Sequence, residues 1–287
     1  DPTRPTPAGG WTNMYVHDAQ VVTWRGGALD GREIAFCASG LSGGFTQTGL
    51  RVVDITDPGN PQTLATLFYP NAGYSHQAWL STDRNYLYLN DELDEQSGLV
   101  SETTTRIINV SDPANPFLVG TFSSGLPSVD HNLYTRDGFI FQANYRSGLR
   151  VFDGTDPENP IEIGYFDTFP NSDSATFNGA WSVYPYFESG TVIVSDIERG
   201  LFILDVPALD EERLLFATPA GVPTTLDPAG GGTLTVEITA RNTGLVDSSV
   251  AMALTDVNGT RSIAGQPQGG GVFTFTFPAV ACGGASF

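Results

Sequence analysis

Short runs of alternating hydrophobic and polar residues fill positions 12–206, and Gly, Pro, Asn and Asp separate the runs. Alternation of this kind predicts half-buried β-strands. One representative unit is expected to hold four strands, at 76–80, 86–90, 105–110 and 117–122. Because no stretch has the apolar period of an amphipathic helix, we expect an all-β chain.

A recurring Asp-Pro-x-x-Pro motif indicates that these strands belong to a repeated unit. The motif begins at Asp57, Asp112 and Asp156, and also at Asp1, with spacings of 57 − 1 = 56, 112 − 57 = 55 and 156 − 112 = 44 residues. A strand precedes each internal copy. Asp-Pro favours a turn, since Pro fixes its own φ and Asp bonds the backbone beyond it. Four short strands per unit at this period are typical of β-propeller blades.

The sequence predicts two domains. Residues 1–214 are expected to form about four propeller blades. Since the chain opens inside an Asp-Pro-x-x-Pro turn, we expect upstream blades in a longer protein, unless the four close by themselves. Residues 220–232 are rich in Pro, Gly and Thr and predict a linker. Strands at 233–241, 250–256 and 272–277 then predict an incomplete immunoglobulin-like β-sandwich within 215–287.

Charge narrows the possible partners. The chain has 32 acidic and 13 basic residues, a formal net charge of −19, and all its basic residues are Arg. Such a surface repels nucleic acid phosphate and anionic lipid, so we expect no nucleic acid partner. No apolar run is long enough for a membrane span. Cys37 lies in an apolar run and is expected to be a buried thiol, unpaired with Cys282.

All three histidines, His17, His76 and His131, fall at the same place in the repeat. Asn178 falls there in the fourth unit. In an antiparallel hairpin the start of one strand lies beside the end of the next. We therefore expect polar neighbours from the second strand of each unit: Asn90, Asp91 and Glu92 for His76, Asn144 and Tyr145 for His131, and Ser195 and Asp196 for Asn178.

This arrangement predicts a candidate metal site at one rim of the propeller. Its ligands would be His17, His76 and His131, with Asp91, Glu92 or Asp196. Imidazole suits Zn, Cu and Fe, and carboxylates extend the choice to Mn and Ca. The rim would also carry Asp18, Asn132, Asn144, Tyr145 and Asn178. The alternative is that the histidines hydrogen-bond neighbouring blades. We interpret the acidic run 91–95 as a solvated turn rather than a Ca²⁺ loop, because it lacks EF-hand spacing.

Several segments resemble the LVIVD-repeat proteins, specifically the bacterial choice-of-anchor B family. The resemblance covers about residues 1–206. It rests on Leu-Arg-Val-Val-Asp-Ile-Thr-Asp-Pro at 50–58 and on the segments 17–20, 90–95, 130–134, 142–146 and 177–181. It implies a secreted or cell-surface bacterial β-propeller, with further blades upstream and, in some members, an extra β-domain before a sorting signal. Because the family has no well-established activity, the resemblance implies no mechanism.

Three functions remain open. The first is a binding or structural module that presents its rim to a protein or glycan. The second is a metal-dependent hydrolase or oxidoreductase, because three histidines with an open coordination position form a catalytic pattern. The third is a subunit of an extracellular assembly whose blades are completed by strands of other chains.

Overall fold

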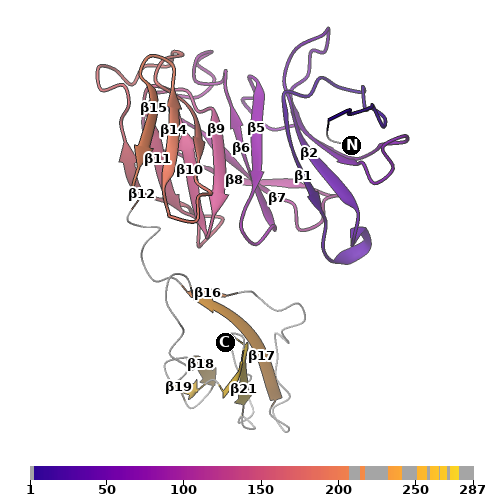
Figure 1. The fold of residues 1–287 in the computed structure, drawn as a ribbon, viewed down its shortest axis with the longest axis vertical. Helices are drawn as coiled ribbons and strands as arrows, with labels where there is room; N and C mark the ends of the chain where they lie inside the picture. Colours follow the sequence, from indigo (N-terminus) through magenta and orange to yellow (C-terminus); the bar gives the residue numbers. More distant parts are fainter. Residues whose placement is uncertain are drawn as a thin grey trace. The chain divides into compact units, whose positions relative to one another are not determined.

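A computed structural model describes residues 3–206, 214–216, 232–240, 251–256, 259–264, 266–269 and 272–277 (Figure 1). The chain divides into two units, Asp1–Asp205 and Val206–Phe287, so the boundary lies before the expected one at 214. The expected linker at 220–232 lies almost wholly outside the described residues. Throughout the described ranges the fold is β, with one 3₁₀ turn, η1 (Gly27–Leu29). No helix in those ranges is long and apolar enough to cross a membrane.

The first unit consists of four antiparallel sheets that follow one another along the chain. The first sheet contains β1 (Asp18–Thr23), β2 (Glu33–Ser39), β3 (Gly49–Asp54) and β4 (Gln62–Leu67). The second contains β5 (Ser75–Leu80), β6 (Tyr86–Asp91), β7 (Thr105–Asn109) and β8 (Phe117–Phe122). The third contains β9 (Asn132–Arg136), β10 (Phe139–Ala143), β11 (Leu149–Asp153) and β12 (Ile161–Phe166). The fourth contains β13 (Ala180–Tyr184), β14 (Val192–Asp196) and β15 (Gly200–Leu204).

The Asp-Pro-x-x-Pro motif forms the turn between the third and fourth strands of three sheets. Asp57 Oδ1 accepts a hydrogen bond from the Gly59 amide at 3.0 Å, and Asp112 Oδ1 accepts one from the Ala114 amide at 3.0 Å. Asp156 repeats the contact at 3.2 Å with the amide of Glu158. The turn mechanism expected from the sequence is therefore confirmed.

Alternating residues of β6 bury opposite faces of the second sheet. Leu87 and Leu89 pack in a cluster with Phe36 of the first sheet, whereas Tyr88 packs with Phe152 of the third. Successive strand side chains point to opposite faces, so a strand buried on both faces needs apolar residues throughout. Burying each large side chain contributes about 1.5–3 kcal/mol. Packing between sheets therefore holds the first unit together.

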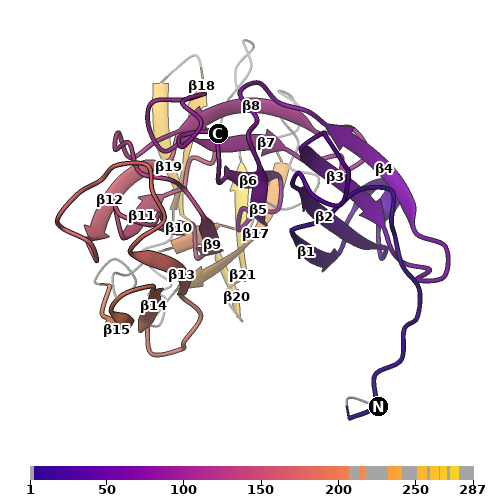
Figure 2. The ribbon, with the colours of Figure 1, turned by 90° about the horizontal axis from the view of Figure 1, so that it is seen from above.

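The first strands of the four sheets lie on the inner side of the unit, with β4, β8 and β12 outermost (Figure 2). Contacts join β1 to β5, β5 to β9 and β9 to β13. This arrangement is a propeller-like repeat fold, as predicted, and it brings repeat-equivalent residues of the first strands together.

The second unit contains six described strands. One sheet has the order β16 (Leu214–Phe216), β17 (Gly232–Ala240), β21 (Val272–Phe277) and β20 (Gln266–Gly269). A separate hairpin pairs β18 (Ala251–Asp256) with β19 (Gly259–Ala264). The three strands expected here from alternation are confirmed as β17, β18 and β21. Cys282 lies outside the described residues.

Candidate functional site

His17, His76 and His131 form a stack across three sheets, here called the histidine ladder. Neighbouring rings of the ladder lie 4.1 Å apart between centroids, with tilts of 40° and 36°. Each Nδ1 atom bonds the backbone of the next sheet: His17 to the His76 carbonyl at 3.1 Å and His76 to the His131 carbonyl at 3.1 Å. The ladder therefore ties the sheets together, as the alternative interpretation of the repeat expected.

Trp181 ends the ladder in the fourth sheet. His131 Nδ1 donates to the Trp181 carbonyl at 2.5 Å, and the two rings lie 4.6 Å apart. The strand pairing of the second and fourth sheets shows that Trp181 is equivalent to His76. A bulge lies at His76, between the pairs Ser75↔Asp91 and Gln77↔Asn90, and the same bulge lies at Trp181, between Ala180↔Asp196 and Ser182↔Ser195. Alignment of the repeat had put Asn178 there, because the connection before the fourth sheet is longer. Trp181 lies 15 residues after the end of β12 (181 − 166), whereas His76 lies 9 residues after the end of β4 (76 − 67).

The hydrogen bonds of the ladder fix the tautomer of each ring. A carbonyl oxygen can only accept, so each Nδ1 carries a proton, and in the neutral rings of His76 and His131 each Nε2 presents a lone pair. Glu92 lies between two of these lone pairs, with Oε2 at 3.8 Å from His76 Nε2 and Oε1 at 3.6 Å from His131 Nε2. Tyr145 donates to Glu92 Oε1 at 2.6 Å. The ligand atoms of His76, Glu92 and His131 all lie within 4.8 Å of one another.

Burial keeps both inner imidazoles neutral. Desolvation, assisted by the neighbouring rings, lowers the pKa of His76 to about 2, and desolvation lowers the pKa of His131 to about 4. Desolvation also raises the pKa of the Glu92 carboxyl, although the hydrogen bond from Tyr145 opposes this. His131 Nε2 is buried and has no hydrogen-bond partner. Neutral imidazole is the form that binds metal, and a buried lone pair without a donor is open to a ligand.

Two carboxylates expected as ligands instead anchor the backbone. Asp91 accepts hydrogen bonds from the Tyr69 hydroxyl at 2.8 Å and from the amides of Gly73 and Tyr74. Asp196 caps its own turn through the amides of Glu198 and Arg199. His17 belongs to the ladder but is solvent-exposed, and its nitrogens do not join the group formed by His76, Glu92 and His131.

The remaining rim residues make hydrogen bonds within the protein or are buried. Asp18 Oδ1 accepts from the Ala19 amide, Asn144 Nδ2 donates to Gln142, and Asn132 is nearly buried. Asn178 accepts from Arg146 and donates to Glu198 instead of meeting Ser195. Tyr145, at φ 42°, pairs its backbone with Ala180 and so links the third sheet to the fourth.

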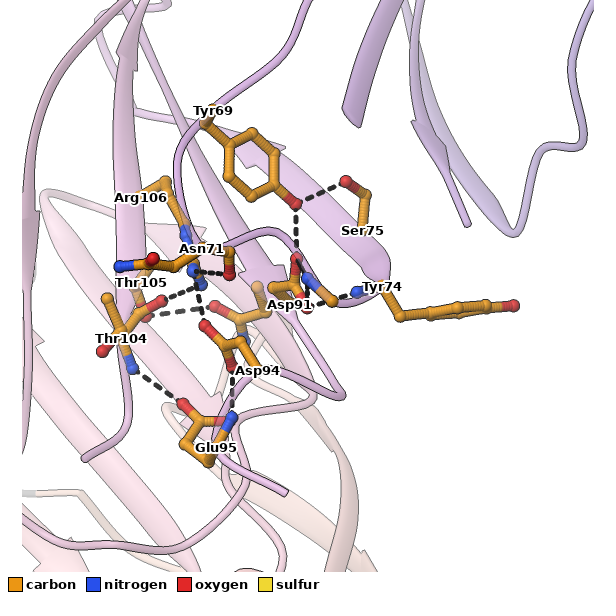
Figure 3. A network of polar contacts seen from close by, with 12 residues as sticks. Tyr69, Asn71, Tyr74, Ser75, Asp91, Asp94, Glu95, Thr104, Thr105 and Arg106 are labelled. Carbon is orange, nitrogen blue, oxygen red and sulfur yellow. Dashed lines mark hydrogen bonds and ion pairs between the residues drawn. The ribbon is translucent and has the colours of Figure 1, made fainter. Parts of the chain in front are cut away.

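Three of the acidic residues in the run 91–95 are buried, contrary to its interpretation as a solvated turn. Asp91 and Asp94 are fully buried and Glu95 is 6% exposed. Figure 3 shows the reason: Arg106, itself 2% exposed, reaches Asp94 with Nη2 2.5 Å from Oδ2. The amide of Thr104 donates to Glu95 at 2.9 Å. Because Arg106 is on β7, the run itself carries no sign of this counterion.

A cavity of about 450 Å³ lies apart from the ladder. Turn residues line it, including Trp24, Leu29, Asp83 and Asp112. It contains no histidine, so it does not enlarge the site described above.

Comparisons with known proteins support the repeat. An LVIVD repeat profile matches residues 73–124, the span of the second sheet. No curated protein matches. Similar solved structures include a functionally unknown protein from Desulfotomaculum acetoxidans DSM 771, 15% identical with a TM-score of 0.45, covering 62% of this chain and 48% of its own. This chain thus spans about half of that protein.

Two further similar structures are a protein from Lactobacillus plantarum and one of unknown function from Bacteroides thetaiotaomicron VPI-5482. The first is 15% identical with a TM-score of 0.44, covering 86% of this chain and 68% of its own. The second is 11% identical with a TM-score of 0.41, covering 98% and 75%. Residues 73–124 match an LVIVD repeat, and the four successive antiparallel sheets of the first unit form a β-propeller-like repeat fold.

Proposed function

We propose that this protein is a binding module whose rim holds one transition-metal ion between His76, His131 and Glu92. The observation that supports this most strongly is the direction of the imidazoles. Both Nδ1 atoms are committed to backbone carbonyls, and both Nε2 atoms face one carboxylate. A hydrogen bond from the second ring nitrogen to a carbonyl is the usual support of a metal-binding histidine.

The distances from Glu92 to the two imidazoles suit a first-row metal. Two ligand atoms that each lie about 2.1 Å from one ion are at most about 4.2 Å apart. The two contacts of Glu92, at 3.8 and 3.6 Å, fall within that limit. Imidazole with carboxylate suits Zn, Fe or Mn, with Cu as a further choice. Tyr145 would orient the carboxylate by its hydrogen bond to Oε1.

The proposal includes a location outside the cell or at its surface. A secreted or cell-surface bacterial protein of the choice-of-anchor B type, with an immunoglobulin-like second unit, agrees with the net charge of −19 and with the LVIVD repeat. Trp181, 49% exposed beside His131, offers an aromatic face next to the metal for a glycan or protein partner.

Elemental analysis of the native protein tests the metal site. We expect one transition-metal ion per chain in the wild type and none in Glu92→Gln, which keeps the shape of the side chain and an acceptor for Tyr145. Asn178→Ala is the matched control, because Asn178 belongs to the rim but contacts Arg146 and Glu198. A wild type that stays metal-free after incubation with Zn²⁺, Mn²⁺, Fe²⁺ and Cu²⁺ overturns the proposal.

Three protein ligands would leave coordination positions open, which is the arrangement of catalytic zinc sites. A metal-dependent hydrolase or oxidoreductase therefore follows as an extension of the same site. Turnover that requires the metal and disappears in Glu92→Gln would establish it. A metal-loaded protein without turnover against ester, phosphoester and redox substrates leaves the binding module as the function.

A second candidate function rests on a separate observation. In this function a strand of another chain completes the fourth sheet. Within the described residues β15 is the outermost strand of a three-stranded sheet, and Leu201 and Ile203 on it are 57% and 71% exposed. An exposed apolar edge strand is a template for strand addition. Leu201→Lys with Ile203→Lys should abolish concentration-dependent association in sedimentation, and a wild type that is monomeric at every concentration refutes this function.

A further inference from the structure

A second group of carboxylates is buried between the second and third sheets. Asp94, Glu95 and Asp130 each offer an oxygen within 4.8 Å of the others. Asp94 and Asp130 are fully buried, and Glu95 is 6% exposed. Asp94 and Glu95 follow β6, whereas Asp130 precedes β9, so the group spans two repeats.

Three oxygens of this group lack donors. Burial raises the pKa of Asp130 well above its usual range, and the backbone of Asp91 opposes this only in part. Neither oxygen of Asp130 has a hydrogen-bond partner, and Glu95 Oε2 has none. Buried carboxylate oxygens without a donor are costly unless a cation meets them. These orphaned oxygens therefore point to a ligand that the polypeptide does not supply.

Charge leads to the same conclusion. Arg106 is the cation that contacts the group in the described part of the chain, through its ion pair with Asp94. Asp91, also fully buried, adds a further carboxylate to the surroundings of Asp94 and Asp130. One guanidinium cannot neutralise several ionised carboxylates, and burial accordingly raises the pKa values of Asp130 and Glu95. A bound cation would let these carboxylates ionise inside the protein, since buried charges are generally paired or bound to metal.

The donor set selects the ion. All three donors are carboxylate oxygens, which hard cations prefer. Calcium–oxygen bonds of 2.3–2.6 Å allow two ligands of one ion to lie up to about 5 Å apart. The three oxygens meet this limit as they stand. We propose that Asp94, Glu95 and Asp130 bind one Ca²⁺ ion, which joins the second sheet to the third.

This site is independent of the metal proposed at His76, His131 and Glu92, and it has a structural role. An ion held from both sides of a sheet interface stabilises the folded state, because the unfolded chain cannot bind it with the same geometry. Since the carboxylates are buried, the ion would enter while the sheets assemble. Removing it therefore requires unfolding rather than simple dialysis.

Refolding with and without the ion tests the proposal. The full chain is unfolded in guanidinium and EGTA, then refolded either in about 1 mM Ca²⁺ or in EGTA. The calcium concentration is chosen because calcium sites of extracellular modules have dissociation constants of about 0.1–1 mM. After gel filtration we expect one Ca²⁺ per chain in the first sample. We also expect a melting temperature about 5 °C or more above that of the second sample.

Variants locate the ion. Asp130→Asn should lose the bound Ca²⁺ and its effect on the melting temperature. Glu188→Gln, which removes an exposed carboxylate, should retain both. Glu92→Gln should also retain both, which separates this site from the histidine site. If Asp130→Asn does not fold, Glu95→Gln takes its place. A wild type refolded in Ca²⁺ that contains no Ca²⁺ and melts as in EGTA overturns the proposal, as does full Ca²⁺ binding by Asp130→Asn.

Discussion

His131 donates its Nδ1 hydrogen to the backbone carbonyl of Trp181, and the two rings lie 4.6 Å apart. A tryptophan therefore ends the ladder in the sheet where a fourth histidine would stand. Its carbonyl still supports the preceding ring, but its side chain offers no metal ligand. The number of imidazoles at the rim is thus limited by the side chain in the fourth sheet rather than by the backbone.

Two substitutions of His131 separate its structural and metal-binding roles. The side-chain amide of asparagine can place an N–H close to the position of Nδ1 but has nothing at Nε2. We expect His131→Asn to bind no metal yet to remain within about 1 kcal/mol of the metal-free wild type. His131→Ala should lose about 2–4 kcal/mol, since it removes a buried hydrogen bond and leaves a cavity. Urea unfolding in chelator measures both, and equal losses would contradict the separate roles.

Acid should destabilise the first unit through the histidines. Their pKa values in the folded protein are about 2 for His76 and about 4 for His131, against 6.5 for an unperturbed histidine. Below pH 6.5 the unfolded chain therefore binds protons that the folded chain does not. The stabilisation is complete above pH 6.5 and declines as the pH falls, by about 2–3 kcal/mol per histidine near pH 4.5.

Raised carboxyl pKa values, such as that of Glu92, act in the opposite direction. The contribution of the histidines is therefore measured as a difference between wild type and the double variant His76→Asn with His131→Asn. Urea unfolding in chelator at pH 7.5, 6 and 4.5 gives the two curves. Parallel curves would show that the histidines do not carry this pH dependence.

Arg106 should be much more important for stability than an exposed arginine. Arg106→Gln leaves Asp94 buried without its partner and should cost about 3–5 kcal/mol. Arg32 also pairs with an aspartate, Asp54, at 2.7 Å, but its side chain is 51% exposed. Arg32→Gln should cost no more than about 1 kcal/mol. Chemical denaturation compares them, and similar losses would mean that burial does not strengthen the Arg106 pair.

Cys37 should be inert in the folded protein. Burial raises the pKa of its thiol to about 11, so at pH 8 about one thiol in a thousand is ionised. In a Cys282→Ser background, Cys37 is the single cysteine. A thiol reagent at pH 8 should leave it unmodified in native buffer and modify it fully in guanidinium. Rapid modification under native conditions would show that the strand it occupies opens easily.

The sequence predicted the strands of the first unit well because each sheet repeats the same alternation and the same Asp-Pro turn. It also predicted that the histidines lie together, because the repeat brings equivalent positions of the first strands side by side. It predicted that Glu92 lies beside His76 because antiparallel pairing within one sheet determines that neighbour. It could not show that Trp181 takes the place of a histidine in the fourth sheet, because the connection from β12 to Trp181 is longer than the one from β4 to His76. The burial of Asp94 depends likewise on Arg106, which lies on the next strand.

The most direct test of the account is the nitrogen NMR spectrum of the histidine rings with and without Zn²⁺. The chain has three histidines, so their ring signals can be assigned by substitution. At neutral pH we expect His76 and His131 to carry their proton on Nδ1, and Zn²⁺ to shift the Nε2 signals of these two rings. Glu92→Gln should abolish the shifts. Protons on Nε2, or Nε2 signals that Zn²⁺ leaves unchanged, would contradict a metal site at the histidine ladder.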